Sequence, residues 1–209
     1  MQNLEGIKKA IIAGQLDQIE NLVQAAIDAK VAAKDILDNG LIAGMQQVGD
    51  CFKRNEMFIP EVMISAKTMQ TGLKLIEPML VGAAHKPKAC IIVGTVKGDL
   101  HDIGKNLVKM MLKGGGFEVI DLGIDVAPEK FLESLIKSEA KIVAMSALIT
   151  TSMPYMKKTI SLFKDKGLSV KTMVGGAPVT QQFADEIGAD GYASDAAQAV
   201  DVAVSLYKN

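Results

Sequence analysis

The chain has 209 residues, of which 49% are hydrophobic and 22% are charged, and its formal net charge at pH 7 is −1. This length fits one or two domains, and the apolar fraction is sufficient for a buried core. The near-neutral charge and the lack of a long apolar run favour neither a nucleic-acid nor a membrane partner, and we expect no leader peptide. Cys51 and Cys90 lie in apolar periodic segments, so we expect buried, reduced thiols in a cytoplasmic protein.

The first 82 or so residues show only helical periodicity. Apolar side chains recur every three or four positions within residues 4–11, 16–27, 37–52 and 62–80. This spacing gives each helix one buried face, and the short connections favour antiparallel packing. We predict a four-helix bundle domain over residues 1–82. A linker over residues 83–88 follows, in which His85 is expected to be a solvated side chain.

From residue 89 onward, predicted strands and helices alternate. The strands are expected at residues 89–95, 117–122, 141–146, 169–174 and 191–193, and glycines mark the helix ends between them. Alternating βα units predict a parallel sheet with helices on both faces. The predicted fold class is therefore α/β, with a Rossmann-like (flavodoxin-like) five-stranded domain over residues 89–209. The glycine fingerprints of dinucleotide and P-loop sites are absent from the sequence.

Asp99 and His101 lie directly after the first predicted strand of this sheet. Ligands of open α/β sheets bind at the carboxyl ends of the strands, which is where this pair is expected. A carboxylate two residues from an imidazole can accept the Nδ1 proton and leave Nε2 free to bind a metal. An Asp-x-His pair alone is usually an ordinary solvated pair, but here Gly98 and Gly104 flank it and permit close approach of a bulky group.

Two further loops are expected at the same sheet edge. The third strand leads into a hydroxyl-rich stretch over residues 146–152, and the fourth leads into the glycine pair Gly175–Gly176. Each feature alone is common, because hydroxyl side chains cap helices and paired glycines make turns. Their occurrence after neighbouring strands of one sheet favours a site for a large ligand.

The segment from Thr95 to Asn106 resembles the cobalamin-binding motif Asp-x-His-x-x-Gly. This motif occurs in methionine synthase, in corrinoid proteins of methanogens and acetogens, and in some B12-dependent mutases. The resemblance implies that a protein histidine replaces the nucleotide tail of the cofactor as the lower axial ligand of cobalt. His101 would be that ligand and the metal-binding residue, Asp99 its hydrogen-bond partner, and Ser152 the hydroxyl that extends this relay towards solvent. The other residues implied to bind the cofactor or its tail are Gly98, Asp102, Ile103, Gly104, Ser146, Leu148, Thr150, Gly175, Gly176 and the last-loop pair Asp195–Ala196.

The helical segment is similar to the cap domain of methionine synthase, in residues 48–52 and 57–62. This resemblance implies that Phe52, Ile59 and Val62 cover the upper face of the corrin and shield the methyl group. A place in the bundle core explains Val62 equally well. Together the two resemblances span about residues 3–207.

The resemblance implies a corrinoid protein that is not an enzyme by itself and has no catalytic residue. It would carry a methyl group on cobalt from a methyl-donor methyltransferase to an acceptor methyltransferase acting on coenzyme M or tetrahydrofolate, with a reductive activase as a third partner. Methylamines, methanol, aromatic methyl ethers and betaines stay open as donors. A B12-dependent sensor or regulator is the main alternative, although no helix-turn-helix precedes the bundle and the cap lacks tryptophan. A mutase subunit usually lacks such a cap, and a non-binding paralogue is the remaining alternative.

Overall fold

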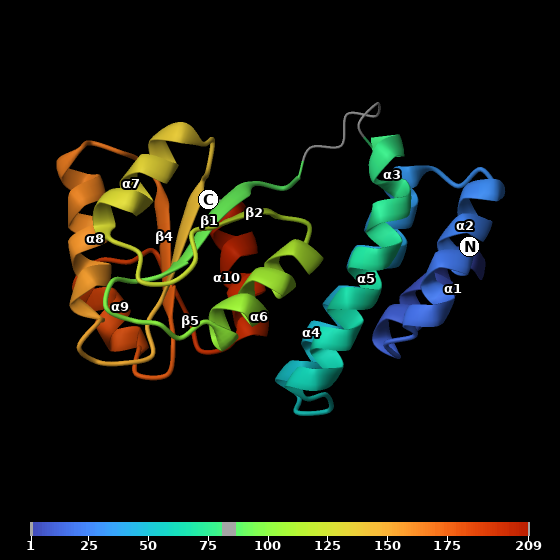
Figure 1. Cartoon of the computed structure of the whole chain (residues 1–209), viewed down its shortest axis with the longest axis horizontal. Coiled ribbons are helices and arrows are strands. Elements are labelled where there is room, and N and C mark those ends of the chain that lie inside the picture. Colours follow the sequence, from blue (N-terminus) through green and yellow to red (C-terminus); the bar gives the residue numbers. More distant parts are fainter. Residues whose placement is uncertain (1, 81–86, 209) are drawn as a thin grey trace. The chain divides into compact units, whose positions relative to one another are not determined.

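The computed structural model describes residues 2–80 and 87–208, and the chain divides into two compact units. A helical unit contains the described residues before Pro87, and an α/β unit contains nearly all of those that follow (Figure 1). Most of the expected linker, His85 included, lies outside the described residues, so the domain bounds 1–82 and 89–209 stay a prediction. None of the helices in the described ranges is long and apolar enough to cross a membrane.

The helical unit consists of four helical segments, as the periodicity predicts. The third segment is continuous from residue 33 to residue 53, but its middle is a π-helix, which the apolar spacing did not reveal. The apolar stripes of all four segments form the core, including Ile7, Ile19, Leu41 and Ile76, each fully buried. The elements are α1 (Gln2–Ile12), α2 (Leu16–Asp28), α3 (Ala33–Asp35), η1 (Ile36–Ile42), α4 (Ala43–Lys53) and α5 (Ile59–Leu80).

The α/β unit contains five parallel strands in the order β2-β1-β3-β4-β5. This order is the flavodoxin-like arrangement, with its switch point between β1 and β3. Each strand lies within two residues of the expected range at either end. The strands are β1 (Cys90–Thr95), β2 (Glu118–Asp121), β3 (Ile142–Ser146), β4 (Lys171–Gly175) and β5 (Gly191–Ala193).

Helices cover both faces of the sheet, because successive strand residues alternate between two separate cores (Figure 1). Ile92 and Val143 pack with α7, α8 and α9, whereas Ile91 and Ile142 pack with α6 and α10. The helices are α6 (Ile103–Gly114), α7 (Pro128–Lys137), α8 (Pro154–Asp165), α9 (Gln181–Ile187) and α10 (Ala196–Lys208).

The two cysteines differ slightly from expectation. Cys51 and Cys90 are both free, but each is half-buried rather than fully buried. Burial raises the pKa of both thiols, which disfavours the reactive thiolate at neutral pH.

Candidate functional site

Three loops meet at the carboxyl edge of the sheet, as expected. Thr95 at the end of β1 pairs with Ser146 at the end of β3, and Ser146 pairs in turn with Gly175 at the end of β4. The segments that follow these residues therefore begin side by side. They lie next to the β1/β3 switch point, where ligands of such sheets bind.

Asp99 is the centre of this edge and is fully buried. Its Oδ2 atom accepts hydrogen bonds from the backbone amides of Leu148 (2.6 Å) and Ile149 (3.3 Å) and from the Ser152 hydroxyl (3.1 Å). Its Oδ1 atom accepts from the backbone amide of His101 at 3.0 Å. The carboxylate thus joins the loop after β1 to the loop after β3.

The hydrogen bonds of Asp99 determine its charge. Burial by itself would raise the pKa of this carboxyl, but donors from Leu148, His101 and Ser152 outweigh burial and lower the pKa to about 2. Several donors directed at one carboxylate favour its ionised form. Asp99 is therefore an anion at neutral pH despite lying inside the protein.

The His101 ring is oriented by this anion. Its Nδ1 atom lies 2.7 Å from Asp99 Oδ1, and because an ionised carboxylate only accepts hydrogen bonds, Nδ1 keeps its proton and donates. Nε2 is then the lone-pair nitrogen, the state that binds a metal ion. The side chain is 54% exposed, so a ligand can reach the ring from outside.

Ser152 extends the pair inward rather than towards solvent. Its side chain is only 1% exposed, and besides Asp99 its hydroxyl is placed to donate to the carbonyl oxygen of Ile149 at 2.8 Å. One hydroxyl proton cannot serve both acceptors fully at once. The Ser152 hydroxyl is therefore shared between Asp99 and the carbonyl of Ile149, and its buried position gives it no direct contact with solvent.

Exposed apolar side chains lie beside His101 in its loop, which the hydrophobic spacing did not predict. Large apolar side chains usually mark burial, yet those of Leu100 and Ile103 are 69% and 76% exposed. A Cβ added at Gly98 or Gly104 would meet no atom within 4 Å, so both glycines border open space. The further exposed apolar side chains on the neighbouring loops are Ile124, Leu148 and Ile149.

These features fit a corrinoid. One imidazole offers one ligand, and a corrin brings the other nitrogen ligands of its cobalt with it. A broad, largely apolar ring also suits a surface of exposed apolar side chains bordered by glycines, since such surfaces mark binding sites. Among the described residues, no group of three or more His, Cys, Asp or Glu side chains could hold a metal ion.

Gly175 and Gly176 have a packing role that the sequence did not indicate. A Cβ at Gly176, whose φ is +127°, would lie 1.8 Å from the carbonyl oxygen of Ala147, and one at Gly175 would lie 2.7 Å from that of Ala193. The glycines therefore permit close contact between neighbouring strand ends. Their role in lining a channel for the cofactor tail stays a prediction.

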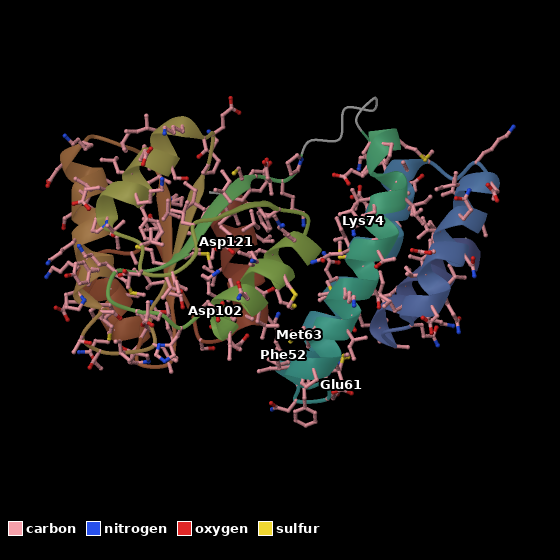
Figure 2. All side chains as sticks on the ribbon, viewed as in Figure 1. Phe52, Glu61, Met63, Lys74, Asp102 and Asp121 are labelled. Atoms are coloured by element: carbon pink, nitrogen blue, oxygen red, sulfur yellow. The ribbon has the colours of Figure 1, made fainter. Side chains whose placement is uncertain are left out.

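The remaining expected residues lie at or beside the same edge. Ser146 is half-buried, Leu148 is 43% exposed and Thr150 is exposed. Asp102 precedes the first turn of α6 (Figure 2) and accepts a hydrogen bond from the side chain of Asn106. In the last loop the carboxylate of Asp195 accepts from the amides of Ala197 and Gln198 and so caps α10, while Ala196 is buried.

The three expected cap residues differ in exposure within the helical unit. Val62 is fully buried, which favours its place in the bundle core, whereas Ile59 is 41% exposed and Phe52 is half-buried. Figure 2 labels Phe52 near the end of α4 and Met63 in the first part of α5. Met63 is 49% exposed and four residues from Ile59, so the two share one face of α5. Nothing in the sequence pattern distinguishes Met63 from a buried residue of the helix.

Two family matches cover most of the chain. A family described as "B12 binding domain" matches residues 89–201, and a second family with the same description matches residues 4–77. The fold and the site thus define a B12-binding protein with a helical and a Rossmann-like part.

Similar proteins specify the class further. The chain is 43% identical to a dimethylamine corrinoid protein of Methanosarcina acetivorans, over 99% of both chains, and 42% identical to a corrinoid protein of Desulfitobacterium hafniense, over 97% of this chain and 96% of that one. Among solved structures, the methanol:cobalamin methyltransferase complex MtaBC of Methanosarcina barkeri matches with a TM-score of 0.90 and 32% identity, covering 100% of this chain and 80% of that chain. The chain belongs to the cobalamin-binding corrinoid proteins of methyltransferase systems.

Proposed function

We propose that this corrinoid protein carries a methyl group on cobalt between two methyltransferases. One would load the methyl group from a donor, and the other would pass it to coenzyme M or tetrahydrofolate. The observation that carries the proposal is the His101–Asp99 pair, an exposed imidazole oriented through Nδ1 by a buried carboxylate. The chain itself would have no catalytic residue and would turn over only with its partners.

His101 is the proposed metal-binding residue and would hold the cobalt of a bound corrinoid. The corrinoid would supply the methyl-transfer chemistry. Asp99 keeps the ring in the tautomer that presents Nε2 and fixes its orientation, as carboxylates do for metal-bound histidines. Ser152 and the amide of Leu148 keep Asp99 ionised and in place.

The rest of the proposed cofactor site lies on the same three loops. Gly98 and Gly104 would admit the corrin beside exposed Ile103 and Leu148. In the helical unit, Phe52 and Ile59 stay proposed as cap residues that would shield the methyl group. In the loaded state the cobalt would carry a methyl group. The remaining residues assigned to the cofactor or its tail are Asp102, Ser146, Thr150, Gly175, Gly176, Ala196 and, with less support because it is buried, Val62.

The proposed partners follow from the named relatives. A dimethylamine corrinoid protein is among them, so a methylamine is the first donor class to test, and methanol is the second because of the match to MtaBC. A reductive activase is the third proposed partner. The free cysteines support a cytoplasmic location.

The proposal is tested by a single turnover. The protein is loaded with reduced cobalamin and mixed with a dimethylamine or methanol methyltransferase and its isotope-labelled substrate, with the His101→Ala protein as control. We expect one labelled methyl group per bound corrinoid, and its loss when a coenzyme M or tetrahydrofolate methyltransferase is added with its acceptor. A protein that binds cobalamin through His101 but is neither methylated nor demethylated by these enzymes would contradict the carrier role and favour a sensor.

A further inference from the structure

The loop that contains His101 is fastened by residues outside the cobalamin-binding motif. Thr95, which is fully buried at the end of β1, donates its hydroxyl hydrogen bond to the carbonyl oxygen of His101 at 2.9 Å. Asp125, which follows β2, uses its carboxylate to accept from the backbone amide of Gly98 at 2.7 Å. The backbone amide of Asp125 also donates to the carbonyl oxygen of Asp99 at 3.0 Å. The peptide groups of residues 98, 99 and 101 are thus held by hydrogen bonds with Thr95 and Asp125.

Asp125 holds the loop at Gly98, where the backbone has the greatest conformational freedom. Gly98 has a φ of +81° and no neighbouring atom within 4 Å of an added Cβ, so neither sterics nor packing fixes its conformation. Asp125 itself has a φ of +52°, a conformation that aspartate and asparagine tolerate better than most residues. Asp125 therefore adopts a left-handed backbone conformation while its carboxylate accepts the hydrogen bond from Gly98.

The loop that contains Asp125 is itself held in place by hydrogen bonds to β1 and α6. Its backbone pairs with β1, because Thr95 donates to Gly123 and Val126 donates to Thr95. At its start, Asp121 accepts from Lys105 at 2.8 Å, from Lys109 at 2.6 Å and from the amide of Gly123 at 3.0 Å. The Lys105 side chain is 2% exposed and lies in α6, directly after the His101 loop. Residues 121–126 are consequently tied to both ends of the segment that presents His101.

We propose that Asp125 and Thr95 are positioning residues for the cobalt ligand His101. By holding the peptide groups of residues 98, 99 and 101, they keep the imidazole where Asp99 can orient it and where Nε2 can bind cobalt. The 2.7 Å bond between Nδ1 and Oδ1 depends steeply on the position of the backbone on which both side chains are mounted. This inference rests on the proposed role of His101 as a ligand.

Two measurements test the inference, and the first requires no cofactor. Hydrogen exchange of the protein without cobalamin measures the exchange rates of the backbone amides of residues 97–102. In Asp125→Ala we expect exchange in this segment to rise roughly twofold to tenfold, the effect of losing one intramolecular hydrogen bond. Asp125→Asn keeps an oxygen acceptor and tolerates the left-handed backbone, so its exchange should stay near that of the wild type.

The second measurement is the electron paramagnetic resonance spectrum of the ¹⁵N-labelled protein loaded with unlabelled cob(II)alamin. Coordination by a protein nitrogen splits each cobalt line into a doublet, whereas the nitrogen of the cofactor tail gives a triplet. The ratio of histidine-coordinated to uncoordinated cobalt should fall roughly twofold to tenfold in Asp125→Ala and in the nearly isosteric Thr95→Val. It should be restored in Asp125→Asn. Lys30→Ala is the matched control, since Lys30 is an exposed residue with a φ of 58° in the helical unit.

The outcomes separate this inference from the proposed function. A wild-type spectrum without the doublet would contradict the ligand role of His101, and with it the inference. A wild-type doublet whose proportion is the same in Asp125→Ala, Thr95→Val and Lys30→Ala would overturn the positioning role alone. Faster exchange at residues 97–102 with unchanged coordination would also overturn it, because the contacts would then stabilise the loop without placing the ligand.

Discussion

The two units present their functional residues in opposite ways. At the carboxyl edge of the sheet, a few polar side chains are held at fixed distances, with Asp99 buried and His101 oriented by it. In the helical unit, the candidate residues are apolar, and two of the three, Phe52 and Ile59, stay partly exposed. A ligand bond requires one defined geometry, whereas shielding requires only apolar cover. Substitutions should therefore have large and specific effects in the first region and small, graded effects in the second.

The largest expected loss of stability comes from Asp121→Asn. Asp121 pairs with the buried Lys105 and with Lys109, and an amide would leave both ammonium groups without a counter-charge. We expect the α/β unit to lose about 3 kcal/mol of unfolding free energy, the lower end for breaking a buried ion pair. Urea unfolding followed by tyrosine fluorescence measures this, because all three tyrosines, Tyr155, Tyr192 and Tyr207, lie in this unit.

Glu133→Gln is the matched control for that measurement. Glu133 also pairs with two lysines, Lys130 and Lys137, but all three side chains are well exposed. Its loss should change the unfolding free energy much less than Asp121→Asn does, because exposed ion pairs contribute little. Equal losses in the two variants would mean that burial of Lys105 adds nothing to the stability of this edge.

The next largest effect is expected for Asp99→Asn in the cobalamin-loaded protein. An amide cannot polarise the imidazole as a carboxylate does, so the ratio of histidine-coordinated to uncoordinated cobalt should fall about 10–100-fold. Spectra of the bound cobalamin measure this ratio. Asp190→Asn is a suitable control, because Asp190 also accepts from a backbone amide, that of Thr172, at the start rather than the end of β4. A coordination ratio that is equal in the two variants would exclude Asp99 from orienting His101.

The stability of the α/β unit should also depend on acid. Hydrogen bonds hold the pKa of Asp99, and lysines hold that of Asp121, at about 2 in the folded protein, against an ordinary value of 3.8. A lowered folded-state pKa contributes stability above the ordinary value, and this contribution is lost as the pH falls from about 4 towards 2. Each carboxylate accounts for about 2 kcal/mol. Urea unfolding at stepwise lower pH should show this decrease in unfolding free energy. In Asp121→Asn the decrease should be smaller by the contribution of one carboxylate, about 2 kcal/mol.

The smallest effect is expected in the helical unit, from Phe52→Ala. If Phe52 covers the upper face of the corrin, the protein loaded with methylcobalamin should lose its methyl group faster in light, because the separated radicals recombine less often. Leu22→Ala, another half-buried apolar side chain of this unit, is the control. Both changes cost stability, less than the about 3–5 kcal/mol of a fully buried phenylalanine, so only the photolysis rates discriminate. Equal rates would make Phe52 an ordinary packing residue.

The sequence was sufficient for the framework of the fold and for the identity of the central pair. Strand limits were predictable because glycines and charged turns punctuate each apolar run, and His101 was conspicuous as one of two histidines. The π-helix over residues 36–42 was not predictable, since apolar spacings of four residues fit an α-helix as well.

The rest of the site depends on contacts that spacing does not encode. Asp125 is 27 positions from Gly98, and their hydrogen bond exists only because β2 lies beside β1. Leu100 and Ile124 are apolar but exposed, whereas apolar periodicity predicts burial. The glycine pair at residues 175–176 suggested a ligand, but its geometry is required by the carbonyl groups of neighbouring strand ends. Local chemistry and the meeting of the three loops were thus readable from the sequence, and individual contacts between distant residues were not.

The central claim is that His101 binds cobalt through Nε2, and isotope labelling tests it most directly. Cob(II)alamin of natural isotopic abundance is bound to ¹⁵N-labelled protein, and the splitting of its cobalt resonance lines is recorded. We predict a doublet from one protein nitrogen in the wild type, and its disappearance in His101→Ala with the cofactor still bound. A triplet in the wild type, or a doublet that persists in His101→Ala, would contradict the account.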